Sequence, residues 1–231
     1  MSDALLYTPS GCVLYLDLRK PVGDKLLDYS GHGNAGTIYE ARLEYRHPLW
    51  GLFFDGKADY VYVGDKPSLK ITGAITLEAL INISSAEKND MSILRKWMPG
   101  KWSYMTRVEV GKFQMLLASG GTIYTFGSGF ELDAHRWYHV VGAYDGARRV
   151  TIYVDGVIVR EYNFKRTIDD TDAPLVIGAR SDGASGFFFG YIALARVYNR
   201  ALTAKEVKRC YEDIKLRLLR RMQPVGVEMI R

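Results

Sequence analysis

Cysteine is scarce in this chain, with only Cys12 and Cys210 among 231 residues. Two cysteines cannot build the disulfide framework of a small secreted scaffold or a cysteine-only zinc site. We expect both thiols to be reduced, and the alternative is a disulfide between them. Asparagine and glutamine are also few, seven in total, which fits a protein from a hot environment because both amides are thermolabile. No run of about 20 apolar residues occurs, so we expect no membrane-spanning helix.

Familiar catalytic motifs are missing as well. The chain has no Gly-x-Ser-x-Gly, no His-Glu-x-x-His and no phosphate-binding loop. Its start, Met1-Ser2-Asp3-Ala4, has neither the basic nor the apolar stretch of a secretory signal, so we expect no signal peptide. Of the net charge of +5, residues 203–222 carry +4, with seven Lys or Arg against three acids. The rest is near neutral, and we do not expect a nucleic-acid partner.

Short strands dominate the pattern up to about residue 199. Residues 75–83 alternate, with the odd positions apolar and Thr76, Glu78 and Asn82 among the even ones. Asp155-Gly156 separates two β-branched runs, a strong hairpin signal because both residues tolerate positive φ. We also interpret residues 55–59 as a hairpin-like turn. A dozen such strands predict one β-sandwich domain.

A helix is predicted at the C-terminal end. Thr203 and Glu206 have the spacing of a capping box, and apolar residues then recur at helical spacing to about Met222. We therefore divide the chain into a β domain at 1–202 and a basic amphipathic helix and tail at 203–231.

Seven short segments occur together in one order. They include Asp28-Tyr29-Ser30-Gly31-His32-Gly33-Asn34, Tyr153-Val154-Asp155-Gly156 and Arg196-Val197-Tyr198-Asn199-Arg200, and the full set lies at residues 28–37, 54–61, 75–79, 137–146, 153–156, 174–179 and 190–203. In these segments the chain resembles the laminin-G-like, or concanavalin A-like, lectin and glucanase domains over about residues 12–212. The resemblance implies an all-β fold, a two-sheet antiparallel jelly-roll sandwich, here followed by a C-terminal α-helix. It implies less about function, because such folds serve lectins, glycosidases, adhesive modules and virion proteins.

Calcium is the cofactor that the resemblance suggests. Some relatives hold calcium with the loop that corresponds to Asp28, Ser30 and Asn34 and with an acid in a late strand. Here Ala193 and Leu194 stand where many relatives have acids. Calcium prefers six to eight oxygen ligands, carboxylates among them, so we expect no tightly bound calcium and no other cofactor. The alternative is that Asp28 and Ser30 satisfy backbone amides of a turn.

Glycoside hydrolysis needs a pair of carboxylates at a defined separation. Related glucanases use Glu-x-Asp-x-x-Glu on one strand, whereas here Glu131-Leu132-Asp133 is followed by Arg136 at the third acid's position. We expect His139, which shares a strand face with Trp137, to be a hydrogen-bonded core residue and not a catalytic base. The chain is therefore predicted to be no enzyme, and glycosidase is the third function considered.

Carbohydrate binding needs an aromatic platform with polar groups beside it. The candidate ligand-binding residues are Trp97 and Trp102, which flank a turn, with Asp182 and Phe187 from a second loop; the alternative for both tryptophans is a role as core anchors. We predict a non-catalytic recognition and assembly module that binds carbohydrate or another protein surface.

Assembly is the second function considered. Leu216 and Leu219 lie off the main apolar stripe of the predicted helix and widen it, which favours a second subunit as a cover. This alternative is a virion structural or decoration protein, a homo-oligomer or larger assembly at a virion or extracellular surface. The other explanation is a helix that packs only on its own sandwich.

Overall fold

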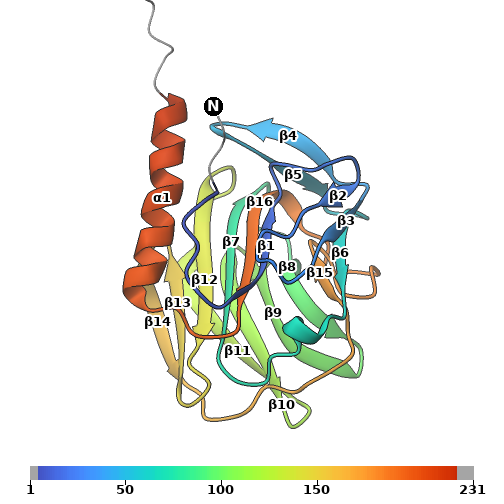
Figure 1. The fold of residues 1–231 in the computed structure, drawn as a ribbon, viewed down its shortest axis with the longest axis vertical. Helices are drawn as coiled ribbons and strands as arrows, with labels where there is room; N and C mark the ends of the chain where they lie inside the picture. Colours follow the sequence, from blue (N-terminus) through green and yellow to red (C-terminus); the bar gives the residue numbers. More distant parts are fainter. Residues whose placement is uncertain (1–4, 223–231) are drawn as a thin grey trace, which may run out of the picture.

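The computed structural model describes residues 5–222, with side chains to residue 217, and has two packed antiparallel sheets and a C-terminal helix (Figure 1). Sheet A contains, in spatial order, β14 (Val157–Asn163), β13 (Arg149–Val154), β12 (Trp137–Tyr144), β7 (Ile75–Ile83), β16 (Phe189–Tyr198), β5 (Leu49–Asp55) and β4 (Arg42–Arg46), and β1 (Cys12–Asp17) also pairs with β16. Sheet B contains β11 (Thr122–Glu131), β10 (Lys112–Ser119), β9 (Lys101–Glu109), β8 (Met91–Met98), β15 (Leu175–Ile177), β6 (Tyr60–Gly64), β3 (Gly36–Tyr39) and β2 (Lys25–Leu26). The predicted all-β jelly-roll sandwich with a terminal helix is confirmed.

The alternation in β7 decides which side chains enter the core between the sheets. Ile75, Leu77 and the other odd positions belong to the main buried cluster, whereas Leu80 belongs to a second cluster on the outer face of sheet A. Because successive side chains of a strand point to opposite faces, Glu78 also lies on that outer face.

The hairpin at Asp155-Gly156 is confirmed. Val154 pairs with Val157, and φ is 50° at Asp155 and 76° at Gly156, as a tight two-residue turn between twisted strands requires.

The interpretation of residues 55–59 as a hairpin was wrong. Asp55 Oδ1 does accept hydrogen bonds from the amides of Lys57 and Ala58, at 2.8 and 3.3 Å, which turns the chain. However, β5 belongs to sheet A and β6 to sheet B, so this turn carries the chain across the sandwich. The local turn chemistry is the same in both cases, and only the long-range strand partners distinguish them.

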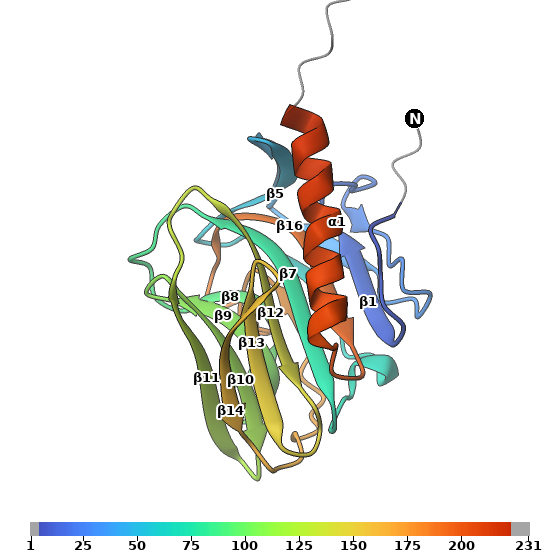
Figure 2. The ribbon, with the colours of Figure 1, turned by 90° about the vertical axis from the view of Figure 1, so that its left-hand side faces the viewer.

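Helix α1 (Ala204–Met222) begins with the predicted capping box. Glu206 Oε2 accepts from the Thr203 amide at 2.8 Å, and Thr203 Oγ1 accepts from the Glu206 amide at 3.3 Å. Val207, Cys210 and Ile214 are buried, and the helix lies over the outer face of sheet A (Figure 2).

The N-terminal segment is attached to the same helix. The Tyr7 amide donates to Asp213 Oδ2 at 2.9 Å, Arg217 donates to the Leu5 carbonyl at 3.0 Å, and the Arg209 guanidinium lies 3.8 Å from the centre of the Tyr7 ring. The two ends of the described chain therefore cover sheet A together. No helix within residues 5–222 is long and apolar enough to cross a membrane.

Candidate functional site

The predicted tryptophan pair lies on the outer face of sheet B. Trp97 in β8 is opposite Trp102 in β9, and the two rings stack with centroids 6.2 Å apart and planes at 26°. Trp97 is only 5% exposed and anchors a small apolar cluster, whereas Trp102 is half-buried at its margin. Core anchoring therefore describes Trp97, and Trp102 remains accessible to a ligand.

The second predicted loop lies beside Trp97. Ser181 Oγ accepts from the Trp97 amide at 2.8 Å, and the Ser181 amide donates to the Trp97 carbonyl at 3.3 Å. Asp182 is exposed and pairs with Arg180 Nε at 2.7 Å, and Phe187 is half-buried. The loop that contains Asp182 therefore contacts Trp97.

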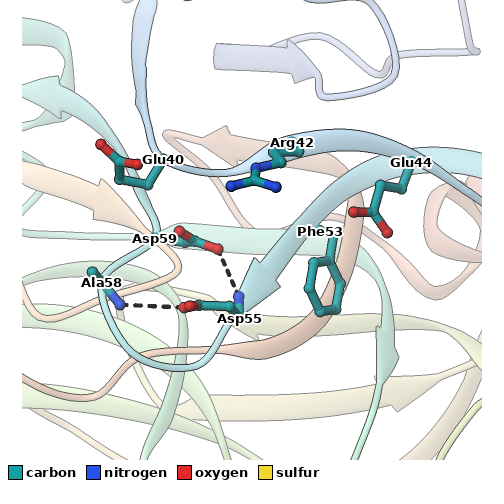
Figure 3. Close-up of a pocket in the computed structure, with 7 residues that line it drawn as sticks. All are labelled: Glu40, Arg42, Glu44, Phe53, Asp55, Ala58 and Asp59. Atoms are coloured by element: carbon teal, nitrogen blue, oxygen red, sulfur yellow. Dashed lines mark hydrogen bonds between the residues drawn. The ribbon is translucent and has the colours of Figure 1, made fainter.

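A hollow of about 300 Å³ lies at the edge of sheet A, where the turn that follows β5 faces β4 (Figure 3). Its lining consists of four acids, one base, one aromatic ring and one small residue, namely Glu40, Asp55, Asp59, Glu44, Arg42, Phe53 and Ala58. We call it the acidic–aromatic hollow. Its formal charge is about −3 when every acid is ionised, which favours a neutral or cationic ligand over an anion.

The turn after β5 fixes two of these acids. The Asp55 amide donates to Asp59 Oδ2 at 2.6 Å, so the two residues are held together at the base of the turn (Figure 3). Burial raises the pKa of Asp59, and its hydrogen bond from the Asp55 amide offsets this only in part. Asp59 therefore holds a proton more readily than an exposed aspartate does.

Aromatic rings continue from the hollow across the outer face of sheet A. The Phe53 ring centroid is 4.9 Å from that of Tyr191, which is 6.3 Å from that of Trp137. Charged groups flank this row: Tyr191 donates its hydroxyl hydrogen to Glu44 at 3.4 Å, and the Arg46 guanidinium lies 5.9 Å from the ring centre of Tyr191. The hollow thus opens onto an amphipathic strip.

Sequence reasoning did not find this hollow, because it did not identify β4 as a strand. The run Arg42-Leu43-Glu44-Tyr45-Arg46 alternates charged and apolar residues, and that period of two was the available signal. Pairing of β4 with β5 places Arg42 opposite Phe53 and Glu44 opposite Gly51. No local pattern links these residues to Asp59, which follows the crossing to sheet B.

The candidate calcium loop is occupied by its own hydrogen bonds. Asp28 Oδ1 accepts from the amides of Tyr15 and Ser30, both at 2.9 Å. Oδ2 accepts from the Asn34 amide and the Ser30 hydroxyl, both at 2.8 Å. The alternative role for Asp28 and Ser30, satisfying backbone amides, matches this geometry, and a calcium ion would have to displace these donors. Within residues 5–222 no three His, Cys, Asp or Glu side chains are grouped to hold a metal ion.

The two acids considered for hydrolysis each interact with another side chain. Glu131 ends β11 and pairs with Lys112 at 3.3 Å, while Asp133 accepts from the Tyr138 hydroxyl at 3.0 Å. His139 is a core residue, as expected: it is 1% exposed, and its Nε2 lies 2.8 Å from Glu78 Oε1.

Glu78 is the centre of a buried polar cluster beneath α1. Tyr198 donates to its Oε2 at 2.7 Å, and Arg196 Nη1 lies 3.4 Å from both oxygens. Burial raises the pKa of Glu78, but the charge of Arg196 and the hydrogen bonds of His139 and Tyr198 more than offset this and hold it at about 2. Glu78 is therefore an ionised side chain with a structural role, and α1 shields it from solvent.

Both cysteines are free and buried near this cluster. Burial raises the pKa of the Cys12 thiol to about 12 and raises that of Cys210 as well. On α1, Leu216 is 53% exposed. The side chain of Leu219, the other predicted assembly residue, lies outside the described part of the chain.

Comparison with known proteins agrees with this architecture. A search of curated proteins finds no match. Among solved structures, the chain is similar to the binding domain of Paraclostridial Mosquitocidal Protein 1, with 14% identity, a TM-score of 0.71, and coverage of 88% of this chain and 52% of that one. The receptor-binding domain of botulinum neurotoxin C/D mosaic serotype gives 12% identity, a TM-score of 0.70, and coverage of 87% and 51%.

A third similar structure is the binding domain of botulinum neurotoxin DC in complex with rat synaptotagmin II, with 13% identity, a TM-score of 0.67, and coverage of 88% and 52%. The chain therefore spans about half the length of the solved structures it matches, and the likeness concerns the fold. A sequence model of one family matches residues 55–208. The chain belongs to that family, the concanavalin A-like lectin/glucanases superfamily.

Proposed function

We propose that the chain is a non-catalytic carbohydrate-binding module and that the acidic–aromatic hollow takes a neutral or amino saccharide. The observation that carries this proposal is the placement of the Phe53 ring beside four carboxylates and Arg42 in one open hollow. An aromatic face packs on the C–H face of a sugar ring, while carboxylate and guanidinium groups make paired hydrogen bonds to its hydroxyls.

The charge of the hollow limits the saccharides that it takes. Arg42 compensates only one of the four acids, so a sulfated or uronic-acid saccharide would meet like charge. A neutral saccharide meets no such repulsion, and the ammonium group of an amino sugar gains attraction. We therefore expect binding to rank amino and neutral saccharides above anionic ones.

The similar structures support a binding role, because all three are binding domains. The hydrogen-bonded turn that holds Asp55 to Asp59 also gives these carboxylates a structural role. Hydrolysis remains the competing function at this place, since a carboxyl with a raised pKa, as in Asp59, is what a general acid needs.

A saccharide panel tests the proposal. The wild-type chain and the variants Phe53→Ala and Glu44→Gln are titrated with neutral, amino and sulfated oligosaccharides by calorimetry. We expect at least tenfold weaker binding for Phe53→Ala. The matched control is Tyr45→Ala, on the opposite face of β4 and 51% exposed, which should bind like wild type. Unchanged affinity in Phe53→Ala contradicts the site, and release of reducing ends that Asp59→Asn abolishes replaces binding with hydrolysis.

Subunit assembly through α1 is a second candidate function. Leu216 is 53% exposed, while Val207 and Ile214 of the same helix are buried against sheet A. A second copy that packed on Leu216 would bury this side chain, and burial of a leucine stabilises a contact. A virion structural or decoration protein would use such a contact to join subunits.

A further inference from the structure

A second hollow, of about 370 Å³, lies on sheet B around Trp102. Its lining comes from two turns and from the segment that leads into β15, namely Gly100, Trp102, Gly121, Asp169, Asp170 and Thr171. We call it the Trp102 hollow. An added Cβ at Gly100 or Gly121 would meet nothing within 4 Å, so the space above both turns is open.

The walls of the Trp102 hollow are firmly held. Trp97 stacks against Trp102 and restricts the indole. Asp169 Oδ1 and Oδ2 accept from the amides of Gly120 and Gly121 at 2.8 and 2.9 Å, and the Asp169 amide donates to the Ala118 carbonyl at 2.9 Å. An aromatic ring that already packs against a neighbouring ring loses less entropy when a ligand stacks on it.

One acceptor of this hollow is uncommitted. Asp170 is exposed and, among the described residues, has no hydrogen-bond or ion-pair partner. Its neighbour Asp172 differs, since it pairs with Lys101 Nζ at 2.7 Å. Asp170 therefore offers free carboxylate oxygens beside a fixed indole, a combination that fits a sugar ring by stacking and by hydroxyl hydrogen bonds.

We infer that the Trp102 hollow is a second carbohydrate site, which makes the chain bivalent. The hollow at β4 and β5 and the turn between β10 and β11 lie toward opposite ends of the long axis (Figure 1). Sites at opposite ends of the molecule cannot share one short oligosaccharide. They link two polysaccharide chains, or bind one surface with an avidity greater than either site alone. The site itself rests on the residues of the Trp102 hollow, whereas bivalency also rests on the function proposed for the acidic–aromatic hollow.

Stoichiometry is the deciding measurement. Neutral hexasaccharides derived from β-glucan, mannan and chitin are titrated by calorimetry into wild type, Trp102→Ala, Phe53→Ala and the double variant. We expect two equivalents bound by wild type, one by each single variant and none by the double variant. Turbidity with the parent polysaccharide should appear for wild type alone.

Two further variants guard against misfolding and loss of packing. Trp102→Phe keeps an aromatic face and should keep two equivalents, while Asp170→Asn, at a partnerless exposed residue, should weaken one class of sites at least fivefold. Trp50→Ala, at an exposed tryptophan that lines neither hollow, is the control and should match wild type.

The outcomes separate the two proposals. One equivalent in wild type that Trp102→Ala and Asp170→Asn leave unchanged overturns the second site and leaves the first. One equivalent that only the Trp102 and Asp170 variants remove supports the Trp102 hollow as a site, overturns bivalency and overturns the acidic–aromatic hollow. No binding of any saccharide overturns both.

Discussion

Replacing Glu78 by glutamine should be among the most destabilising single changes in the β domain. The carboxylate is fully buried and faces Arg196, which is also fully buried. Glutamine keeps the shape but removes the charge, so that the Arg196 guanidinium is left without its counter-ion. Removing one partner of a buried ion pair costs about 3–5 kcal/mol. We expect the free energy of unfolding at pH 7 to fall by that amount in urea titrations followed by tryptophan fluorescence.

The pH dependence gives an independent measure of the same interaction. The pKa of Glu78 is about 2 in the folded chain, against an ordinary 4.5. Because the folded pKa is depressed, the stabilisation is fully present above pH 4.5 and is lost as pH falls through about 2. A shift of this size corresponds to about 3 kcal/mol. The difference between wild type and Glu78→Gln should therefore shrink between pH 4.5 and 2.

Two further variants test whether Glu78 compensates the charge of Arg196. Glu131→Gln removes an exposed acid paired with Lys112 and should cost less than about 1 kcal/mol. Adding Arg196→Met to Glu78→Gln removes the stranded charge and should restore part of the lost stability. If Glu78→Gln is as stable as Glu131→Gln, or if Arg196→Met adds its full cost, Glu78 does not compensate Arg196.

Three more outcomes are expected. Millimolar calcium should leave the melting temperature unchanged, since four donors already occupy Asp28; a rise that disappears in Asp28→Ala would contradict this. Incubation with β-glucans should release no reducing ends, and turnover that depends on Glu131 or Asp133 would show the opposite. Changing Leu216 and Leu219 together to Lys should split an assembly, measured by light scattering, and leave the β-sheet circular dichroism intact, because burial of each leucine at a subunit contact contributes about 1.5–3 kcal/mol. A monomeric wild type at high concentration rules that assembly out.

Local chemistry determined the features that depend on near neighbours in the chain. The capping box at Thr203 and Glu206 and the Asp155-Gly156 hairpin each need only a few consecutive residues, so the sequence alone predicted them correctly. Alternation in β7 likewise assigned the faces of the strand, because the period of two is a property of the extended backbone.

Strand pairing could not be obtained in the same way. Residues 55–59 have the composition of a hairpin turn, yet they join strands of different sheets, and nothing within the turn distinguishes the two cases. The acidic–aromatic hollow depends on this, since Asp59 meets Arg42 only because β5 pairs with β4 before the chain crosses to sheet B.

Burial was also decided by the tertiary structure. The sequence placed Glu78 on a strand face and showed an isolated acid there. Only the fold covers that face with α1 and brings Arg196, His139 and Tyr198 to the carboxylate. The same holds for Trp102 and Asp170, which are 68 positions apart. The sequence by itself determined the strand periodicity, the Asp155-Gly156 turn and the helix start, because these follow from the backbone geometry of neighbouring residues. The contacts between distant residues that form both hollows and the buried ion pair were decided by the packing of the whole chain.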